Sequence, residues 1–327
     1  MEMTKEALRK ICRDLKLYTT PEVNDKLYLH YKGFQRVENL EEYVGLRALW
    51  LEGNGFACIE GLDALVELRC LYLQENCISV MENLDSLVNL DTINLNNNMI
   101  SRIAGISTLS HLRTLMLANN KIKEVDDMGA LVDCAATLSV VDLSNNLLHD
   151  GEGVLHVLEQ LPELKVLYLK GNALVTSIPS YRKTVITRLK NLAYLDDRPV
   201  FPDERLCAKA WASGGIEAER KERTRLNQER NEADLRRLDD FDAMINEYRQ
   251  KARAEGQSSD EGDTKDDDDD DLFGERSGEA FGIPAQGDDD EDDHEDDGEA
   301  AVECPDLEVV GRKLDAVSVP GEPSVTQ

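Results

Sequence analysis

LRALWLEGN at residues 46–54 recurs along the chain with the form L-x-x-L-x-L-x-x-N, where some L positions hold another aliphatic residue. The later copies are LRCLYLQEN (68–76), LDTINLNNN (90–98), LRTLMLANN (112–120), LSVVDLSNN (138–146) and LKVLYLKGN (164–172). The first four copies begin 22 residues apart, and the next two follow at intervals of 26. Self-similarity at such a period indicates a solenoid in which each copy is one structural unit.

Each copy is expected to form a short strand, a turn and a return segment. Side chains two apart on a strand point to the same side, so Leu49 and Leu51 should point into the core. Apolar residues recur every third position in the return segments, as at Ile100, Ile103 and Ile106. The pattern predicts an α/β solenoid of the leucine-rich repeat type, with parallel strands on the concave face and short helical or 3₁₀ turns on the convex face.

An asparagine ends the repeated phrase in all six copies. Its carboxamide is expected to bond backbone groups that the turn leaves free, because an unpaired buried group costs about 1–3 kcal/mol. This structural ladder consists of Asn54, Asn76, Asn98, Asn120, Asn146 and Asn172.

The ends of such an array need caps, because an open end would expose the core. Residues 1–26 are expected to form the N-terminal cap, 27–177 the repeats, and 178–202 the C-terminal cap. An amphipathic helix is expected at 4–18, with an apolar edge of Ala7, Leu8, Ile11, Leu15 and Tyr18. The C-terminal end of the core should be closed by Ile178, Tyr181, Val185, Leu189, Leu192 and Leu195.

Two charged segments follow the caps. Residues 203–255 are expected to form a helical extension, interrupted at Gly214-Gly215. Its second part is either a solvated helix or a short coiled-coil contact, with apolar residues at Leu235, Leu238, Phe241, Ile245 and Tyr248. Residues 256–327 are expected to be a disordered acidic tail, because 254–327 hold 4 Lys and Arg against 27 Asp and Glu.

Composition excludes several classes of function. The net charge is −29, with the excess acidity in the tail, which argues against a general nucleic-acid-binding surface. Seven cysteines without a C-x-x-C indicate reduced thiols in a cytosolic protein, and no signal peptide or 18-residue apolar run is present. We therefore expect a cytoplasmic monomer without a membrane partner.

The sequence contains no recognisable motif for catalysis or for cofactor binding. The five histidines belong to no recognisable nucleophile or metal motif, and no phosphate-binding glycine motif occurs. One acidic register at Asp293 resembles a calcium loop, but its twelfth position is Cys304 instead of a carboxylate. We expect no enzyme activity, no catalytic residue, no cofactor and no metal site.

Function is then expected on the concave face, where the residue between two inward side chains points outward. This centre column consists of Tyr28, Trp50, Tyr72, Asn94, Met116, Asp142 and Tyr168. A flanking column consists of His30, Glu52, Gln74, Asn96, Ala118, Ser144 and Lys170. Adjacent strands are about 4.8 Å apart, so Tyr28, Trp50 and Tyr72 should form a contiguous aromatic patch. Such a patch is either a protein-binding surface or inert filling of the strands.

Two stretches resemble a particular family. The run at 178–201 is similar to the C-terminal cap of the 22-residue class of leucine-rich repeats. LYLHYKGFQRVENLEEYVGLRALWLEGNGF (27–56) and IPSYRKTVITRLKNLAYLDDRPVFPDERLCAKAWASGG (178–215) look like the dynein axonemal assembly factors with leucine-rich repeats. The resemblance covers roughly residues 1–255 and does not extend in detail to the acidic tail.

This resemblance implies a role in cytoplasmic preassembly of dynein arms for motile cilia or flagella. It implies axonemal dynein subunits, chaperones or other assembly factors as partners. The alternative is a resident structural subunit of the axoneme or a phosphatase-regulatory subunit.

Overall fold

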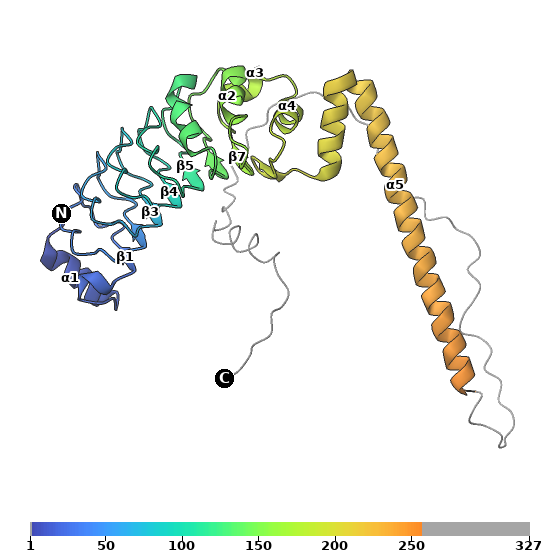
Figure 1. The fold of residues 1–327 in the computed structure, drawn as a ribbon, viewed down its shortest axis with the longest axis horizontal. Coiled ribbons are helices and arrows are strands. Elements are labelled where there is room, and N and C mark those ends of the chain that lie inside the picture. The colour runs from blue at the N-terminus through green and yellow to red at the C-terminus, as the bar shows by residue number, and fades with distance from the viewer. Residues whose placement is uncertain (1, 257–327) are drawn as a thin grey trace, which may run out of the picture. The chain divides into compact units, whose positions relative to one another are not determined.

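The computed structural model describes residues 2–256, in which nine short strands form one sheet whose order follows the sequence (Figure 1). All neighbouring strands are parallel except the last pair. The strands are β1 (Lys26–Tyr28), β2 (Ala48–Trp50), β3 (Cys70–Tyr72), β4 (Thr92–Asn94), β5 (Thr114–Met116), β6 (Val140–Asp142), β7 (Val166–Tyr168), β8 (Tyr194–Leu195) and β9 (Arg198–Pro199). The helices are α1 (Lys5–Asp14), η1 (Pro21–Val23), η2 (Val125–Cys134), α2 (Gly151–Leu158), α3 (Leu174–Ser177), α4 (Tyr181–Arg188) and α5 (Pro202–Gly256). The predicted leucine-rich repeat solenoid is confirmed.

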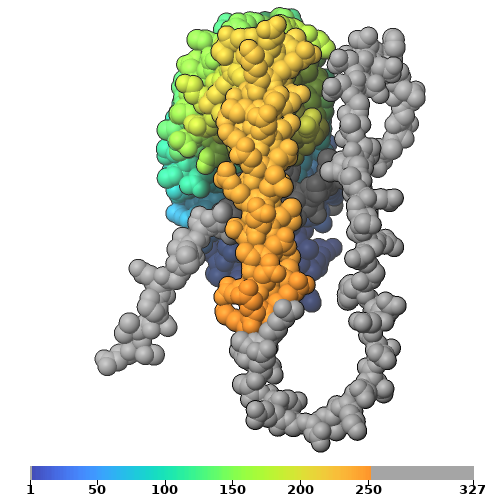
Figure 2. All heavy atoms as spheres, turned by 90° about the vertical axis from the view of Figure 1, so that its right-hand side faces the viewer, coloured from blue at the N-terminus to red at the C-terminus, as the bar shows by residue number. Residues whose placement is uncertain are grey.

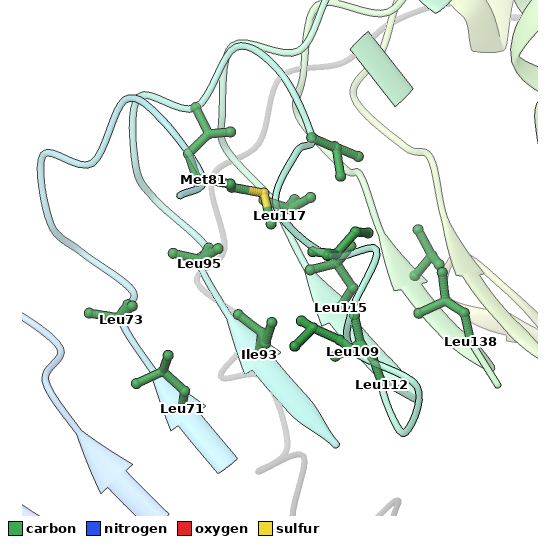
Figure 3. Close-up of a cluster of buried hydrophobic side chains, with 14 of the residues drawn as sticks. Leu71, Leu73, Met81, Ile93, Leu95, Leu109, Leu112, Leu115, Leu117 and Leu138 are labelled. Atoms are coloured by element: carbon green, nitrogen blue, oxygen red, sulfur yellow. The ribbon is translucent and has the colours of Figure 1, made fainter. Parts of the chain in front are cut away.

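Equivalent positions of successive copies lie side by side, because each strand pairs in register with the strand of the next copy. Leu71 pairs with Leu49 on one side and with Ile93 on the other. These side chains are fully buried, and Figure 3 shows Leu71, Ile93 and Leu115 in one row beside a parallel row of Leu73, Leu95 and Leu117. The core is therefore a set of continuous aliphatic rows, and the residues between the rows face the concave side.

The return segments of the 22-residue copies form single turns with hydrogen bonds between residues three apart, as in a 3₁₀ turn. The N–H of Leu65 donates to the carbonyl of Leu62, and the N–H of Leu68 donates to the carbonyl of Leu65. Among the described repeats, helices occur in the longer copies, as η2 and α2, and after the last copy, as α3 and α4. Four additional residues supply about one turn of α-helix, for which a 22-residue copy has no room.

The N-terminal cap differs in detail from the expectation. Helix α1 covers the first repeat with Leu8 and Cys12, which are both buried. Leu15 and Tyr18, predicted to complete the apolar edge, are 44% and 65% exposed. That part of the prediction was wrong because the helix ends at Asp14, so residues beyond it leave the helical face.

The C-terminal end of the core is closed by α4 and by the hairpin of β8 and β9. Of the six predicted closing residues, only Tyr181 is half-buried, and the other five are buried. Asp196 in the hairpin turn accepts hydrogen bonds from the N–H groups of Leu169 (2.8 Å) and Lys170 (3.0 Å). Its other carboxylate oxygen accepts from the Tyr181 hydroxyl at 3.0 Å. The Asp196 side chain thus accepts hydrogen bonds from two N–H groups beyond the end of β7, where no strand residue pairs with them.

Helix α5 consists of two arms, because Gly214 and Gly215 leave helical geometry and Gly215 has a φ of +68°. The second arm is anchored beside α4 near its start. Glu219 is 5% exposed and accepts from Nζ of Lys183 at 2.7 Å and from Nη2 of Arg223 at 2.8 Å.

Further along, the second arm of α5 exposes nearly all its side chains to solvent, as Figure 2 shows for the yellow to orange rod. Leu238 and Tyr248, two of its predicted apolar seam residues, are 60% and 75% exposed. The coiled-coil interpretation of this arm stays a prediction. Except for Gly256, the predicted acidic tail lies outside the described residues.

Candidate protein-binding surface

The asparagine ladder holds the strands in register and so positions the concave face. Asn98 is typical: its Oδ1 accepts from the N–H of Ile78 at 3.0 Å, and its Nδ2 donates to the carbonyls of Leu73 and Leu95 at 3.0 Å. Each carboxamide therefore bonds its own copy and the preceding one. Asn76, Asn98, Asn120, Asn146 and Asn172 are buried, and Asn54 at the first full copy is half-buried.

Three rings of the centre column stack on one another across β1, β2 and β3. The ring centroids of Tyr28 and Trp50 are 4.5 Å apart with an interplanar angle of 27°, and those of Trp50 and Tyr72 are 5.1 Å apart at 16°. All three side chains are half-buried. We call these residues the aromatic stack. Each ring therefore covers part of the face of its neighbour, and the three side chains support one another within the chain itself.

The rings of His30 and Tyr31 extend the stack. Neither residue belongs to the centre column, so the sequence analysis did not predict these ring contacts. His30 lies 6.3 Å from Tyr28 and 6.0 Å from Tyr31, in edge-to-face geometry in both cases. The hydroxyl of Tyr31 donates to Oε2 of Glu75 at 2.8 Å, which raises the pKa of Tyr31. The ring of Tyr31 lies over Gly53, where a larger side chain would collide with it. This glycine is the one feature of the sequence that could have indicated the position of the Tyr31 ring.

Replacing Gly53 with alanine is expected to lower the free energy of unfolding by about 1–2 kcal/mol. Gly53 has a φ of +63°, and a Cβ there would lie 2.0 Å from the Tyr31 ring. The ring would have to move and its hydrogen bond to Glu75 would break. Gly33→Ala is the matched control for urea unfolding, because Gly33 has a φ of +71° but its Cβ would meet nothing within 4 Å. Equal losses in the two variants would contradict a role for the Tyr31 contact.

The remaining centre-column residues do not join the stack. Oδ1 of Asn94 accepts from the N–H of Asn96 at 3.1 Å, and Oδ1 of Asp142 accepts from the N–H of Ser144 at 2.9 Å. Burial raises the pKa of Asp142. Met116, which was also predicted to contact a partner, is only 8% exposed and offers little surface for binding. Neighbouring residues cover most of its side chain.

A second, smaller aromatic pair lies near the other end of the sheet. The ring centroids of Tyr168 and Tyr194 are 6.0 Å apart at an angle of 52°. Burial raises the pKa of Tyr168 to about 12, with a further contribution from the neighbouring Tyr194. The four aromatic residues of the centre column therefore fall into two groups, which are separated by β4, β5 and β6.

The flanking column beside the aromatic stack contains unpaired polar atoms. Nδ1 of His30, Oε2 of Glu52 and Oε1 of Gln74 are buried without a hydrogen-bond partner, and they are the three such side-chain atoms in the part of the chain that the structure describes. The side chain of Glu52 is 14% exposed, and its Oε1 lies 3.7 Å from Nδ1 of His30. That distance is too long for a hydrogen bond.

Other kinds of site find little support among residues 2–256. No cluster of three or more His, Cys, Asp or Glu side chains with metal-binding geometry occurs there. No helix in this part of the chain is long and apolar enough to cross a bilayer. A cavity of about 390 Å³ lies between α4 and α5, and its walls include the ion pairs Arg182–Glu204 and Lys183–Glu219.

Stacked copies, an asparagine ladder and an outward-facing column of rings define a leucine-rich repeat scaffold. A leucine-rich repeat family model matches residues 34–220, and the chain belongs to this family. The more particular resemblance predicted from 27–56 and 178–215 is also confirmed. Human dynein axonemal assembly factor 1 is 71% identical over 221 residues, which are 68% of this chain and 30% of the human protein.

A relative from another organism is similar over nearly the same length of this chain. Leucine-rich repeat-containing protein ODA7 of Chlamydomonas reinhardtii is 59% identical over 230 residues, covering 70% of this chain and 53% of that protein. The chain thus spans between about a third and a half of the length of these curated relatives. A solved internalin of Listeria monocytogenes is 22% identical, covers 63% of this chain and 65% of its own, and has a TM-score of 0.44.

Proposed function

We propose that this protein is a non-catalytic protein-binding scaffold that acts in the cytoplasmic preassembly of axonemal dynein arms. The concave face holds axonemal dynein subunits, chaperones or other assembly factors. The observation that carries the proposal is the aromatic stack, which lies on a solenoid that is 71% identical to human dynein axonemal assembly factor 1 over 221 residues. Half-buried aromatic residues of this kind carry a disproportionate share of interface energy.

The centre column supplies the contact residues in this proposal. Tyr28, Trp50 and Tyr72 act as the main anchor, with Tyr168 at a second point of contact. Asn94 and Asp142 present polar groups between the two aromatic groups. Both aromatic groups lie on the outward side of one parallel sheet, so one elongated partner segment can contact both.

Replacing Trp50 with alanine is expected to weaken partner binding by about 30-fold or more, because truncating a central aromatic anchor typically costs about 2 kcal/mol or more. The melting temperature should change little, since Trp50 lies outside the aliphatic rows. The measurement is quantitative recovery of co-purifying proteins with the tagged full chain from ciliated cells. Trp211→Ala is the matched control, because this other tryptophan lies in α5 near Lys183, away from the strands. Unchanged recovery with Trp50→Ala would count against the concave face.

Cell fractionation separates this proposal from the alternative of a resident axonemal or phosphatase-bound subunit. A preassembly factor is expected in the soluble fraction when axonemes are extracted with detergent. Retention of most of the protein in salt-resistant axonemes would favour a resident subunit. Co-purification of a phosphatase catalytic subunit in equal amount would favour the regulatory alternative.

A further inference from the structure

The three unpaired polar atoms of the described residues all occur at one place, beside the aromatic stack. They belong to His30, Glu52 and Gln74, which occupy equivalent positions on the rungs of β1, β2 and β3. Buried polar atoms without partners are uncommon in folded proteins, and each is destabilising. Three on consecutive rungs point to a site for a hydrogen-bonding ligand.

The chemistry of the ligand that this site fits follows from the unpaired oxygen atoms. Glu52 Oε2 and Gln74 Oε1 are both acceptors, and their strands lie about 4.8 Å apart. Among the described residues, no Lys or Arg nitrogen lies within 4.0 Å of Glu52, and the basic side chain nearest to it in that range is the imidazole of His30, at 3.7 Å. Arg47 and Arg69 stand five residues earlier on the same rungs, about 16 Å away along the strands. The site therefore fits a cationic hydrogen-bond donor.

We infer that Glu52 and Gln74 bind an arginine side chain of the partner segment that lies on the aromatic stack. A guanidinium presents donors in a planar fork that can reach acceptors on two adjacent strands, whereas a lysine ammonium is a single point charge. The rings of Tyr28, Trp50 and Tyr72 cover one another's faces, so their edges form an apolar wall against which the arginine stem packs. Glu52 and Gln74 are half-buried, so both side chains border the surface on which the partner segment lies.

This inference rests on the proposed function and names the chemistry that the binding face selects. It predicts that an arginine-containing probe binds even when the natural partner is absent. The probe is the capped tripeptide acetyl-Gly-Arg-Gly-amide, added to the ¹⁵N-labelled full chain. The readout is the indole N–H signal of Trp50, and the indole signal of Trp211 is the internal control.

The Trp50 signal is expected to shift with a dissociation constant on the order of millimolar, while the Trp211 signal stays in place. Glu52→Gln should weaken binding about tenfold or more, and Gln74→Glu should tighten it several-fold by adding a second carboxylate. Glu67→Gln, which alters an exposed carboxylate in a return segment, should leave binding unchanged.

Three results would overturn the arginine site. They are an equal shift with the citrulline tripeptide, equal affinity for the lysine tripeptide, and unchanged affinity in both the Glu52 and the Gln74 variants. The experiments distinguish failure of the arginine site from failure of the proposed function. If Trp50→Ala loses partners but the arginine peptide does not bind, the binding face stands and the arginine site falls. If the peptide binds but Trp50→Ala recovers partners normally, the arginine site stands and the proposed function of the face falls.

Discussion

Replacing Leu95 with arginine is expected to unfold the repeat array. Leu95 is fully buried, and Figure 3 shows it in the row between Leu73 and Leu117. The substitution removes about 1.5–3 kcal/mol of apolar burial and places an unpaired charge in the core, at a further cost of several kcal/mol. The sum is comparable with the ~5–15 kcal/mol that stabilises a typical domain. Circular dichroism and urea unfolding measure the result.

Val88→Arg is the control for this prediction, because it introduces the same side chain at an apolar residue that is 44% exposed. Its free energy of unfolding should stay within about 0.5 kcal/mol of the unsubstituted protein. A Leu95→Arg protein that melts like the unsubstituted chain would mean that the inward face has been misassigned. Unfolding of both variants would point to a general intolerance of arginine and not to burial.

Replacing Asn120 with alanine is expected to have the second-largest effect, a loss of about 3–5 kcal/mol. The Asn120 side chain is 2% exposed, and its Oδ1 accepts from the N–H of Ile100 at 3.0 Å. Its Nδ2 donates to the carbonyls of Leu95 and Leu117, both at 3.0 Å. Removing the carboxamide leaves the N–H of Ile100 buried without a partner, at about 1–3 kcal/mol. It also removes one of two donors from each carbonyl, at about 0.5–1.5 kcal/mol per bond, because Leu95 still accepts from Asn98 and Leu117 from Asn146.

Asn89→Ala provides the matched comparison in urea unfolding. Asn89 also donates to a backbone carbonyl, that of Val66 at 3.0 Å, but this hydrogen bond is exposed to solvent. Water can replace the lost donor there, so the expected loss is below about 1 kcal/mol. Similar losses in the two variants would show that burial of the ladder contributes little to its strength.

Several features of this fold were predictable because they depend on neighbouring copies alone. Successive strands pair one copy apart, as Leu49 does with Leu71, so the repeat period dictates which side chains share a row. The inward leucines and the positions of the ladder asparagines follow from that period. The interruption of α5 at Gly214-Gly215 was predictable from backbone chemistry.

Other features could not be predicted because they depend on contacts between unlike residues. Tyr31 follows a strand and does not belong to the centre column, yet it reaches Glu75 on the third rung by lying over Gly53. Asp196 bonds N–H groups of the preceding rung, although its copy departs from the repeat. Met116 shares a column with Trp50 but is largely covered.

The amino-acid sequence by itself determined the stack of rungs, its register and the side of each strand that faces outward. Only the tertiary structure decided which outward side chains touch. It therefore decided where the rings gather, and where one oxygen each of Glu52 and Gln74 is buried without a hydrogen bond. The physical reason is that a repeat specifies backbone spacing through interactions that every copy shares. The contacts of a surface side chain depend on the rotamers and sizes of its particular neighbours, which differ from rung to rung.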